Sequence, residues 1–168
     1  MRVINITFSS EQEKIDFVNK CEADFESKLT DVSNRAKETN VQTLFISGPT
    51  CAGKTTTAKK IIDDFENEGK QVTVISYDNF FKSRKEQRVV AHNEELDYDS
   101  VDVLNFDTLR ECVNKAKPGS IVRVPIYDFL LQSTSGYEEH IISENGIIIF
   151  EGIQAVYPEI TSLFNKIV

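Results

Sequence analysis

A glycine-rich segment that ends in lysine and threonine carries the clearest chemical signal in this sequence. The segment fits the pattern G-x-x-x-x-G-K-[ST] and reads Gly48-Pro49-Thr50-Cys51-Ala52-Gly53-Lys54-Thr55. In such a loop the backbone N–H groups point inward and, with the N-terminus of the following helix, bind phosphate. The pattern predicts a nucleotide site that runs to Thr56, in which Lys54 reaches the β- and γ-phosphates and the Thr55 hydroxyl binds Mg²⁺.

Two carboxylates stand at the ends of apolar segments that follow this loop. Asp78 comes just after the run 72–76, and Glu151 closes the run 147–151. A carboxylate in the place of Asp78 can accept a proton from a hydroxyl that attacks a γ-phosphate, or orient that hydroxyl. The alternative is an aspartate that only caps the next turn. The chain has no Asn-Lys-x-Asp sequence, the guanine-reading motif of GTPases, and Glu151 is a single carboxylate, not the acidic pair of motor ATPases.

Aromatic residues next to carboxylates occur twice more, at Tyr98-Asp99 and at Tyr127-Asp128. An aromatic ring can pack on the face of a ring-shaped substrate while the carboxylate accepts from its hydroxyls. The pairs therefore indicate a substrate with hydroxyl groups. Each pair taken alone is equally compatible with an ordinary loop aromatic.

The elements that must hold these residues alternate between strand and helix. Short, nearly continuous apolar runs at 43–47, 72–76 and 147–151 are typical of parallel strands covered on both faces. Helices are predicted from Lys54 to about Asn67 and near Asp107–Lys117, and further strands at 120–125 and 138–143. The stretch 82–100 between them is polar. This alternation predicts an α/β fold with a parallel sheet and flanking helices.

The N-terminal part follows a different pattern. Residues 2–8 alternate as in a short strand, and overlapping capping signals at Ser9 and Ser10 precede a long amphipathic helix that extends to about Lys37. We therefore expect residues 1–40 to form an appendage of strand and helix, and residues 41–168 to form the main domain.

Composition restricts the classes of function. The chain has 168 residues and a net charge of 19 − 27 = −8, which disfavours a non-specific nucleic-acid binder with a broad basic face. No apolar run approaches the roughly 18 residues of a membrane span, and no signal-peptide pattern is present. Three well-separated cysteines form no disulfide or zinc pattern, which favours a reduced, cytoplasmic setting.

One basic cluster departs from the acidic composition. The segment 82–88 holds Lys82, Arg84, Lys85 and Arg88 with a single acid, Glu86. The cluster could draw an anionic substrate or nucleotide toward the site. The alternative is a solvated, mobile loop.

Taken together, the motifs resemble the uridine kinase family, which comprises uridine–cytidine kinases and the related phosphoribulokinases. The resemblance extends from about Leu44 to Pro158 through the ordered blocks GPTCAGKTTTA, ISYDNFFK, LDYDS, VPIYDF and IIIFEGIQAVYP. It implies transfer of the γ-phosphate of ATP, with Mg²⁺, to the 5′-hydroxyl of a uridine- or cytidine-like nucleoside. It also implies Asp78 as catalytic base, with Lys54 on the phosphates, and Glu151 as a carboxylate near the metal.

The resemblance further implies which residues surround the nucleoside: Phe81, Tyr98, Asp99, which is expected on the ribose hydroxyls, Tyr127 and Gln132. Gln132 stands where the family commonly has a base-contacting histidine, and Thr134 replaces an arginine. Glutamine can hydrogen-bond a base edge but cannot carry charge. The nucleobase is therefore open, and phosphorylation of another small alcohol is an alternative.

The segment after Glu151 departs from the family in another way. The family continues with a lid that carries arginines, whereas the only basic residue after Glu151 is Lys166. An alternative function is therefore nucleotide binding with little or no turnover. The resemblance implies a sheet in the order 2-3-1-4-5, so one side of the strand at 43–47 would be unpaired. We expect that a missing C-terminal segment, residues 1–40 or self-association into a homo-oligomer covers this edge.

Overall fold

The computed structural model describes residues 6–39, 41–49, 53–90 and 97–164. The chain divides into two compact units, Met1–Asn40 and Val41–Val168. In the described part of the chain, the first unit contains one long helix and the second contains all of the strands. None of the described helices is both long enough and apolar enough to cross a bilayer.

Helix α1 (Glu11–Glu38) confirms the long helix that the capping signals predict. The Ser10 hydroxyl accepts from the Glu13 N–H at 3.1 Å, and the Glu13 carboxylate accepts from the Ser9 N–H at 2.6 Å. These two bonds satisfy backbone donors that the first helical turn leaves without partners.

The prediction of a strand over residues 2–8 is wrong for residues 6–8. Residues 2–5 lie outside the described residues, and residues 6–8 form no strand. A strand needs a neighbouring strand for its backbone groups, whereas here the chain enters α1 almost at once. The ring of Phe8 packs against that of Phe17, with centroids 5.4 Å apart.

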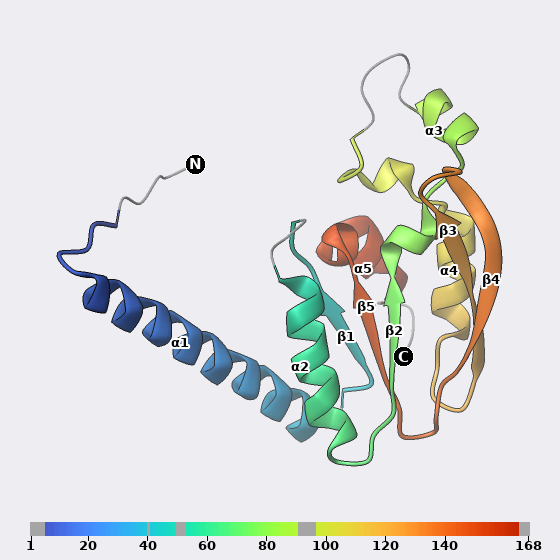
Figure 1. The fold of residues 1–168 in the computed structure, drawn as a ribbon. Helices are drawn as coiled ribbons and strands as arrows, with labels where there is room; N and C mark the ends of the chain where they lie inside the picture. The colour runs from blue at the N-terminus through green and yellow to red at the C-terminus, as the bar shows by residue number, and fades with distance from the viewer. Residues whose placement is uncertain (1–5, 40, 50–52, 91–96, 165–168) are drawn as a thin grey trace. The chain divides into compact units, whose positions relative to one another are not determined.

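A parallel sheet of three strands forms the centre of the second unit (Figure 1). Its strands β1 (Thr43–Ile46), β2 (Val72–Ser76) and β5 (Ile147–Glu151) lie in the order β1-β5-β2. This order confirms the part of the implied sheet that the three apolar runs form. The first four residues of β5 are all buried, as expected of a central parallel strand.

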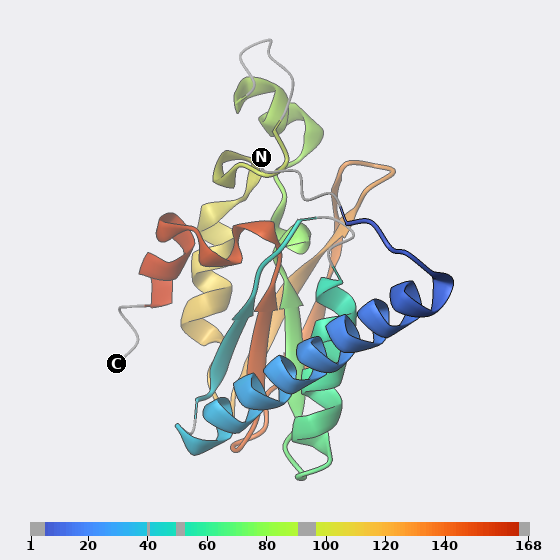
Figure 2. The same cartoon turned by 90° about the vertical axis from the view of Figure 1, so that its left-hand side faces the viewer.

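Helices cover both faces of this sheet. Figure 2 shows α2 (Lys54–Glu66) on one side of the strands and α4 (Phe106–Lys115) and α5 (Pro158–Phe164) on the other. Buried residues of α4 and α5 share a core with Ile148 and Phe150, every second residue of β5. Because strand side chains alternate, Ile147 and Ile149 face the opposite side.

Two elements of the structure differ from those predicted: a hairpin with longer strands, and a short helix in the polar stretch 82–100. Strand β3 (Ile121–Asp128) does not end at Pro125 but continues through it, and pairs with β4 (Ser133–Ile141). Tyr127 and Asp128 are thus the last residues of a strand, not loop residues. Helix α3 (Arg84–Val90) occupies part of the polar stretch 82–100, which contradicts the loop interpretation of the basic cluster.

The described part of this unit also contains three short 3-10 helices: η1 (Tyr77–Phe80), η2 (Val101–Val103) and η3 (Ile153–Val156). η1 directly follows β2, and η3 follows β5 after one glycine. Residues 80–82 lie against residues 103–105, with backbone bonds from Lys82 N–H to Val103 O at 2.8 Å and from Asn105 N–H to Phe80 O at 2.7 Å.

The aromatic packing around Phe150 yields a prediction about stability. Phe150 is 1% exposed, and its ring centroid lies 5.8 Å from that of Tyr77 and 5.0 Å from that of Phe164. We expect Phe150→Ala to lower the free energy of unfolding by about 3–5 kcal/mol, because it leaves a cavity in the core. Urea unfolding followed by circular dichroism measures this change.

Leu130→Ala is the control, because Leu130 is 96% exposed and the loss there should stay within about 0.5 kcal/mol. Equal losses for the two variants would contradict the assignment of Phe150 to the core.

Candidate active site

The carboxyl ends of the three parallel strands meet at one edge of the sheet. Glu151 is paired with Ile46 of β1 on one side and with Ser76 of β2 on the other. The residues that follow Ile46 and Ser76 therefore emerge next to Glu151. In open α/β sheets this edge is where ligands bind.

Gly152 fixes the path of the chain just after Glu151. Its φ is +152°, and its N–H donates to the Ile46 carbonyl at 3.0 Å. A Cβ at this position would lie only 3.0 Å from the Cβ of Tyr77. Glycine is therefore required here for both conformation and space.

The predicted phosphate loop connects β1 to α2. Gly53 has φ +82° and occupies the N-cap of α2, so that α2 begins at Lys54 as predicted. The Lys54 ammonium donates to the carbonyls of Gly48 at 2.6 Å and Pro49 at 3.0 Å. Thr55 and Thr56 are exposed in the first turn of α2. The remaining predicted loop residues, Thr50, Cys51 and Ala52, lie outside the described residues.

Asp78 lies in η1, two residues beyond β2. Its carboxylate interacts electrostatically with Glu151 and with Lys54. Partial burial raises the pKa of Asp78, and the negative charge of Glu151 raises it further. The positive charge of Lys54 opposes both effects. The structure thus brings together the three charged residues that the sequence singles out, although Asp78 still contacts solvent.

The donor groups at this edge fit a magnesium ion. Thr55 supplies a hydroxyl, and Glu151 is close enough to Asp78 for their charges to interact. Mg²⁺ is usually held by one or two carboxylates together with substrate phosphates and water. The described residues contain no cluster of three or more acidic, histidine or cysteine side chains that could hold a metal ion.

A cavity of about 290 Å³ opens beside Asp78. Asp78 is the only charged residue that lines it among the described residues; the others are Phe81, Tyr98, Tyr127, Phe129 and Gln132. We call it the acceptor cavity. Five of its six residues are sequence-predicted site residues, brought together from η1, the loop before η2 and the β3–β4 hairpin.

The aromatic residues form one wall of the acceptor cavity. The ring of Phe81 lies edge-on to those of Tyr98, Tyr127 and Phe129, with centroids 5.8, 5.5 and 6.3 Å away. Tyr127 and Phe129 are themselves 5.2 Å apart. Such edge-to-face contacts stabilise the rings against one another and give the cavity an apolar surface for a flat ligand.

Two buried glutamines hold this wall in place. Gln87 is fully buried, and its amide donates to the Tyr127 hydroxyl at 3.3 Å. Gln154, also fully buried, donates from its amide to the Tyr98 carbonyl at 2.8 Å. The Oε1 atoms of both have no protein partner among the described residues. These glutamines position the two tyrosines from behind.

The structure also shows what the sequence reasoning missed. Phe129 lines the acceptor cavity but was not predicted, although its place in the VPIYDF block was a usable signal. Gln87 and Gln154 were missed because polar residues are ordinarily expected on the surface. Asp99 is exposed beside Tyr98 and does not line the acceptor cavity.

Comparison with known proteins identifies relatives of the second unit. Residues 44–166 match the family described as Phosphoribulokinase / Uridine kinase family. A uridine kinase of Mycoplasma genitalium is 31% identical over 122 residues, which cover 73% of this chain and 56% of that protein. A protein of Arabidopsis thaliana named inorganic pyrophosphatase TTM2 is 34% identical over 120 residues, covering 71% of this chain but 16% of that protein.

The fold is similar to that of solved kinases. A structure described as a possible uridine kinase from Bacillus stearothermophilus matches with a TM-score of 0.67 at 20% identity, covering 83% of this chain and 77% of that one. The curated relatives named above are longer proteins: this chain spans a little over half of the bacterial one and about a sixth of the plant one.

The position of Lys54 predicts an effect on nucleotide affinity. We expect Lys54→Ala to weaken ATP binding by about ten- to a hundredfold, because the variant loses a charged hydrogen-bond donor to the phosphates. Isothermal titration with Mg·ATP measures the effect. Lys59→Ala, an exposed lysine of the same helix, is the matched control and should bind as the wild type does.

The raised pKa of Asp78 predicts that replacing this residue by asparagine lowers activity but raises stability. A base must be ionised, so Asp78→Asn should lower turnover by about 10²–10⁴-fold with little change in ATP affinity. Because the folded state raises the pKa of Asp78, the folded protein holds this proton more tightly than the unfolded chain does. Stability from this group is therefore lost as pH rises through the raised pKa, and Asp78→Asn should raise Tm at neutral pH.

Steady-state kinetics and differential scanning fluorimetry test both effects, with Asp63→Asn on the exposed face of α2 as the control. Wild-type activity should fall as pH is lowered through the raised pKa of Asp78. A variant that turns over normally would refute the assignment of Asp78 as the base.

Proposed function

Because the chain belongs to the phosphoribulokinase / uridine kinase family, we propose that it transfers the γ-phosphate of ATP to the 5′-hydroxyl of a uridine- or cytidine-like nucleoside. The observation that carries this proposal is the position of Asp78. This residue lines the acceptor cavity and also interacts electrostatically with Lys54 and Glu151 on the phosphate side. One carboxylate thus connects the place of the attacking hydroxyl with the place of the phosphate.

The reaction assigns a task to each group. The acceptor oxygen forms a bond to the γ-phosphorus, the bond from that phosphorus to the β,γ-bridging oxygen breaks, and ADP leaves. The hydroxyl proton passes to the Asp78 carboxylate. Lys54 leaves its loop carbonyls to contact the β- and γ-phosphates. When bound, Mg²⁺ neutralises charge on the phosphates, and Thr55 and Glu151 would hold it.

The walls of the acceptor cavity support an organic ring as acceptor. The rings of Phe81, Tyr98 and Tyr127 offer apolar surface, and the Gln132 amide, which donates to the Tyr98 hydroxyl at 3.4 Å, adds a polar group at the rim. A site for hydrolysis of pyrophosphate, the activity in the name of the plant relative, would need only water and phosphate next to the metal. Aromatic walls favour phosphoryl transfer to a small molecule over that activity.

A turnover panel tests the proposal. Purified protein with Mg·ATP is incubated with uridine, cytidine, a series of small alcohols or pyrophosphate, and ADP and product are measured by mass spectrometry. We expect ADP formation that depends on a nucleoside, and a rise of at least about tenfold in the nucleoside KM for Phe81→Ala, because the variant loses the central ring of the wall.

Two outcomes would contradict the proposal. Tight ATP binding without transfer to any acceptor would indicate the alternative function, nucleotide binding with little or no turnover. Release of phosphate from pyrophosphate at a rate above any transfer to an acceptor would indicate a hydrolase.

A further inference from the structure

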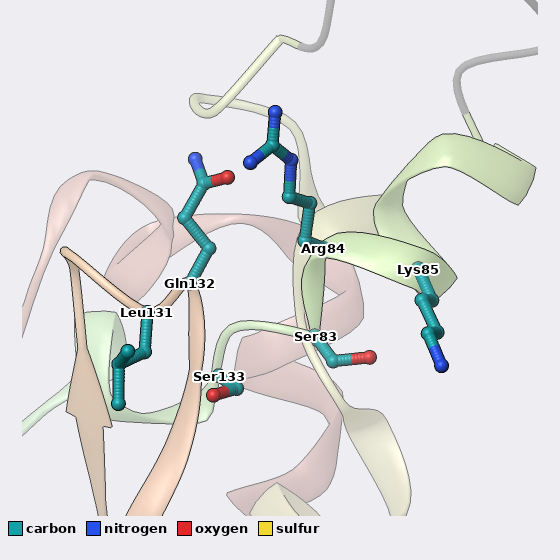
Figure 3. Close-up of a pocket in the computed structure, with 6 residues that line it drawn as sticks. All are labelled: Ser83, Arg84, Lys85, Leu131, Gln132 and Ser133. Atoms are coloured by element: carbon teal, nitrogen blue, oxygen red, sulfur yellow. The ribbon is translucent and has the colours of Figure 1, made fainter.

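Exposed apolar side chains gather at the tip of the β3–β4 hairpin and along helix α1. At the hairpin tip, Figure 3 shows Leu131 beside Gln132, which lines the acceptor cavity, so this tip belongs to the site already described. Helix α1 carries none of the site residues. Its exposed apolar residues are Ile15, Phe17, Val18, Phe25 and Val32.

The apolar residues of α1 follow a heptad repeat. With Ile15 as position a, the a and d positions up to residue 36 are Ile15, Val18, Glu22, Phe25, Leu29, Val32 and Ala36. Six of these seven residues are apolar, and such a repeat sustained over three heptads is typical of helices that pair in a coiled coil. Phe17 lies outside the repeat, and its ring packs against that of Phe8.

Most of the repeat is accessible to a second helix. Ile15, Val18 and Val32 are 45%, 45% and 47% exposed, and Leu29 is half-buried, whereas Ala36 is buried. The stability of a helix in water depends more on burial of its apolar face than on the propensity of its residues. The a and d positions over residues 15–32, which we call the α1 stripe, therefore offer α1 a face that a second helix would stabilise by covering.

The two halves of α1 differ in charge, and this difference favours an antiparallel pair. Residues 11–24 carry five acidic and two basic side chains, whereas residues 25–38 carry three of each. In a parallel pair the two acidic halves would lie side by side and repel. In an antiparallel pair each acidic half lies beside a half without net charge.

Glu22, the polar residue of the α1 stripe, favours the same orientation. In a parallel pair, position a faces position a, so the Glu22 carboxylates of two copies would meet between the helices, where like charges removed from water are costly. Antiparallel helices place position a against position d. A pair centred on the α1 stripe then sets Glu22 against Phe25 of the second copy and avoids the meeting of carboxylates.

We propose that α1 pairs with α1 of a second copy of this chain, antiparallel and through the α1 stripe. In this pair Ile15 faces Val32 of the second copy, and Val18 faces Leu29 of the second copy. Each contact occurs twice, because a pair of identical chains related by a twofold axis uses the same surface on both. The pairing does not depend on the proposed phosphoryl transfer.

Sedimentation equilibrium of the full chain over a series of concentrations tests the pairing. We expect a reversible dimer whose dissociation constant rises at least about tenfold in Val18→Glu, because this variant places a charge between the helices. Glu22→Leu should lower the dissociation constant by about tenfold, since it replaces a carboxylate by apolar surface. Ser27→Glu adds the same charge as Val18→Glu at exposed position f, away from the seam, and is the matched control. Circular dichroism checks that α1 stays helical in each variant.

Lys14→Glu tests the orientation of the pair. Both Lys14 and Arg35 occupy position g, and an antiparallel pair places Lys14 beside Arg35 of the second copy. Reversal of the charge of Lys14 then replaces repulsion by attraction and should strengthen the dimer. In a parallel pair the same change adds an acid to two acidic halves that already lie together, and should weaken the dimer.

Three results would overturn the proposal. A chain that is monomeric at every concentration would refute the pairing and leave the α1 stripe to another segment of this chain or to a different protein. A dimer that Val18→Glu leaves intact would place the contact elsewhere on the chain. A dimer that Lys14→Glu weakens would refute the antiparallel orientation.

Discussion

Strand β5 lies between β1 and β2, and its backbone hydrogen bonds to both strands set where the phosphate-handling groups lie. The register places Ile46 and Ser76 on either side of Glu151. The chain continues from Ile46 into the phosphate loop and from Ser76 into η1, which carries Asp78. No contact between side chains is needed to gather these groups. A shift of one residue in either pairing would turn the side chains of that strand to the opposite face and misplace the site.

The phosphate side of the site could be predicted because its signals are local. A strand, a glycine-rich loop and a helix follow one another within residues 43–66, and each has its own pattern of residue types. Asp78 and Glu151 could be chosen because each stands at the end of an apolar run. The topology of a parallel sheet then requires those ends to lie together, so local patterns lead to a correct long-range arrangement.

The acceptor side was less predictable because it depends on contacts between segments far apart in sequence. Whether Tyr127 belongs to a loop or a strand depends on the pairing of β3 with β4, and Pro125 misleads because proline is tolerated at the edge of a small sheet. The burial of Gln87 and Gln154 follows from hydrogen bonds to Tyr127 and to the loop at Tyr98. The residue type of a glutamine gives no indication of such partners. Helix α3 lies in a polar stretch of the sequence. The start of the helix is fixed by the hydrogen bond from the Arg84 N–H to the Gln132 carbonyl in the hairpin turn.

The close approach at Gly152 has a consequence for how a site of this kind can diversify. Because the backbone at Gly152 passes against the Tyr77 side chain, the spacing between the Glu151 and Asp78 segments is set by this close packing. Substitutions elsewhere do not easily alter it. The hairpin tip contributes to the acceptor cavity through side chains such as Phe129 and Gln132, and its neighbouring residues Leu130 and Leu131 are largely exposed. The frame that holds Glu151 and Asp78 is thus fixed by close packing, while the surface at the hairpin tip remains free to vary.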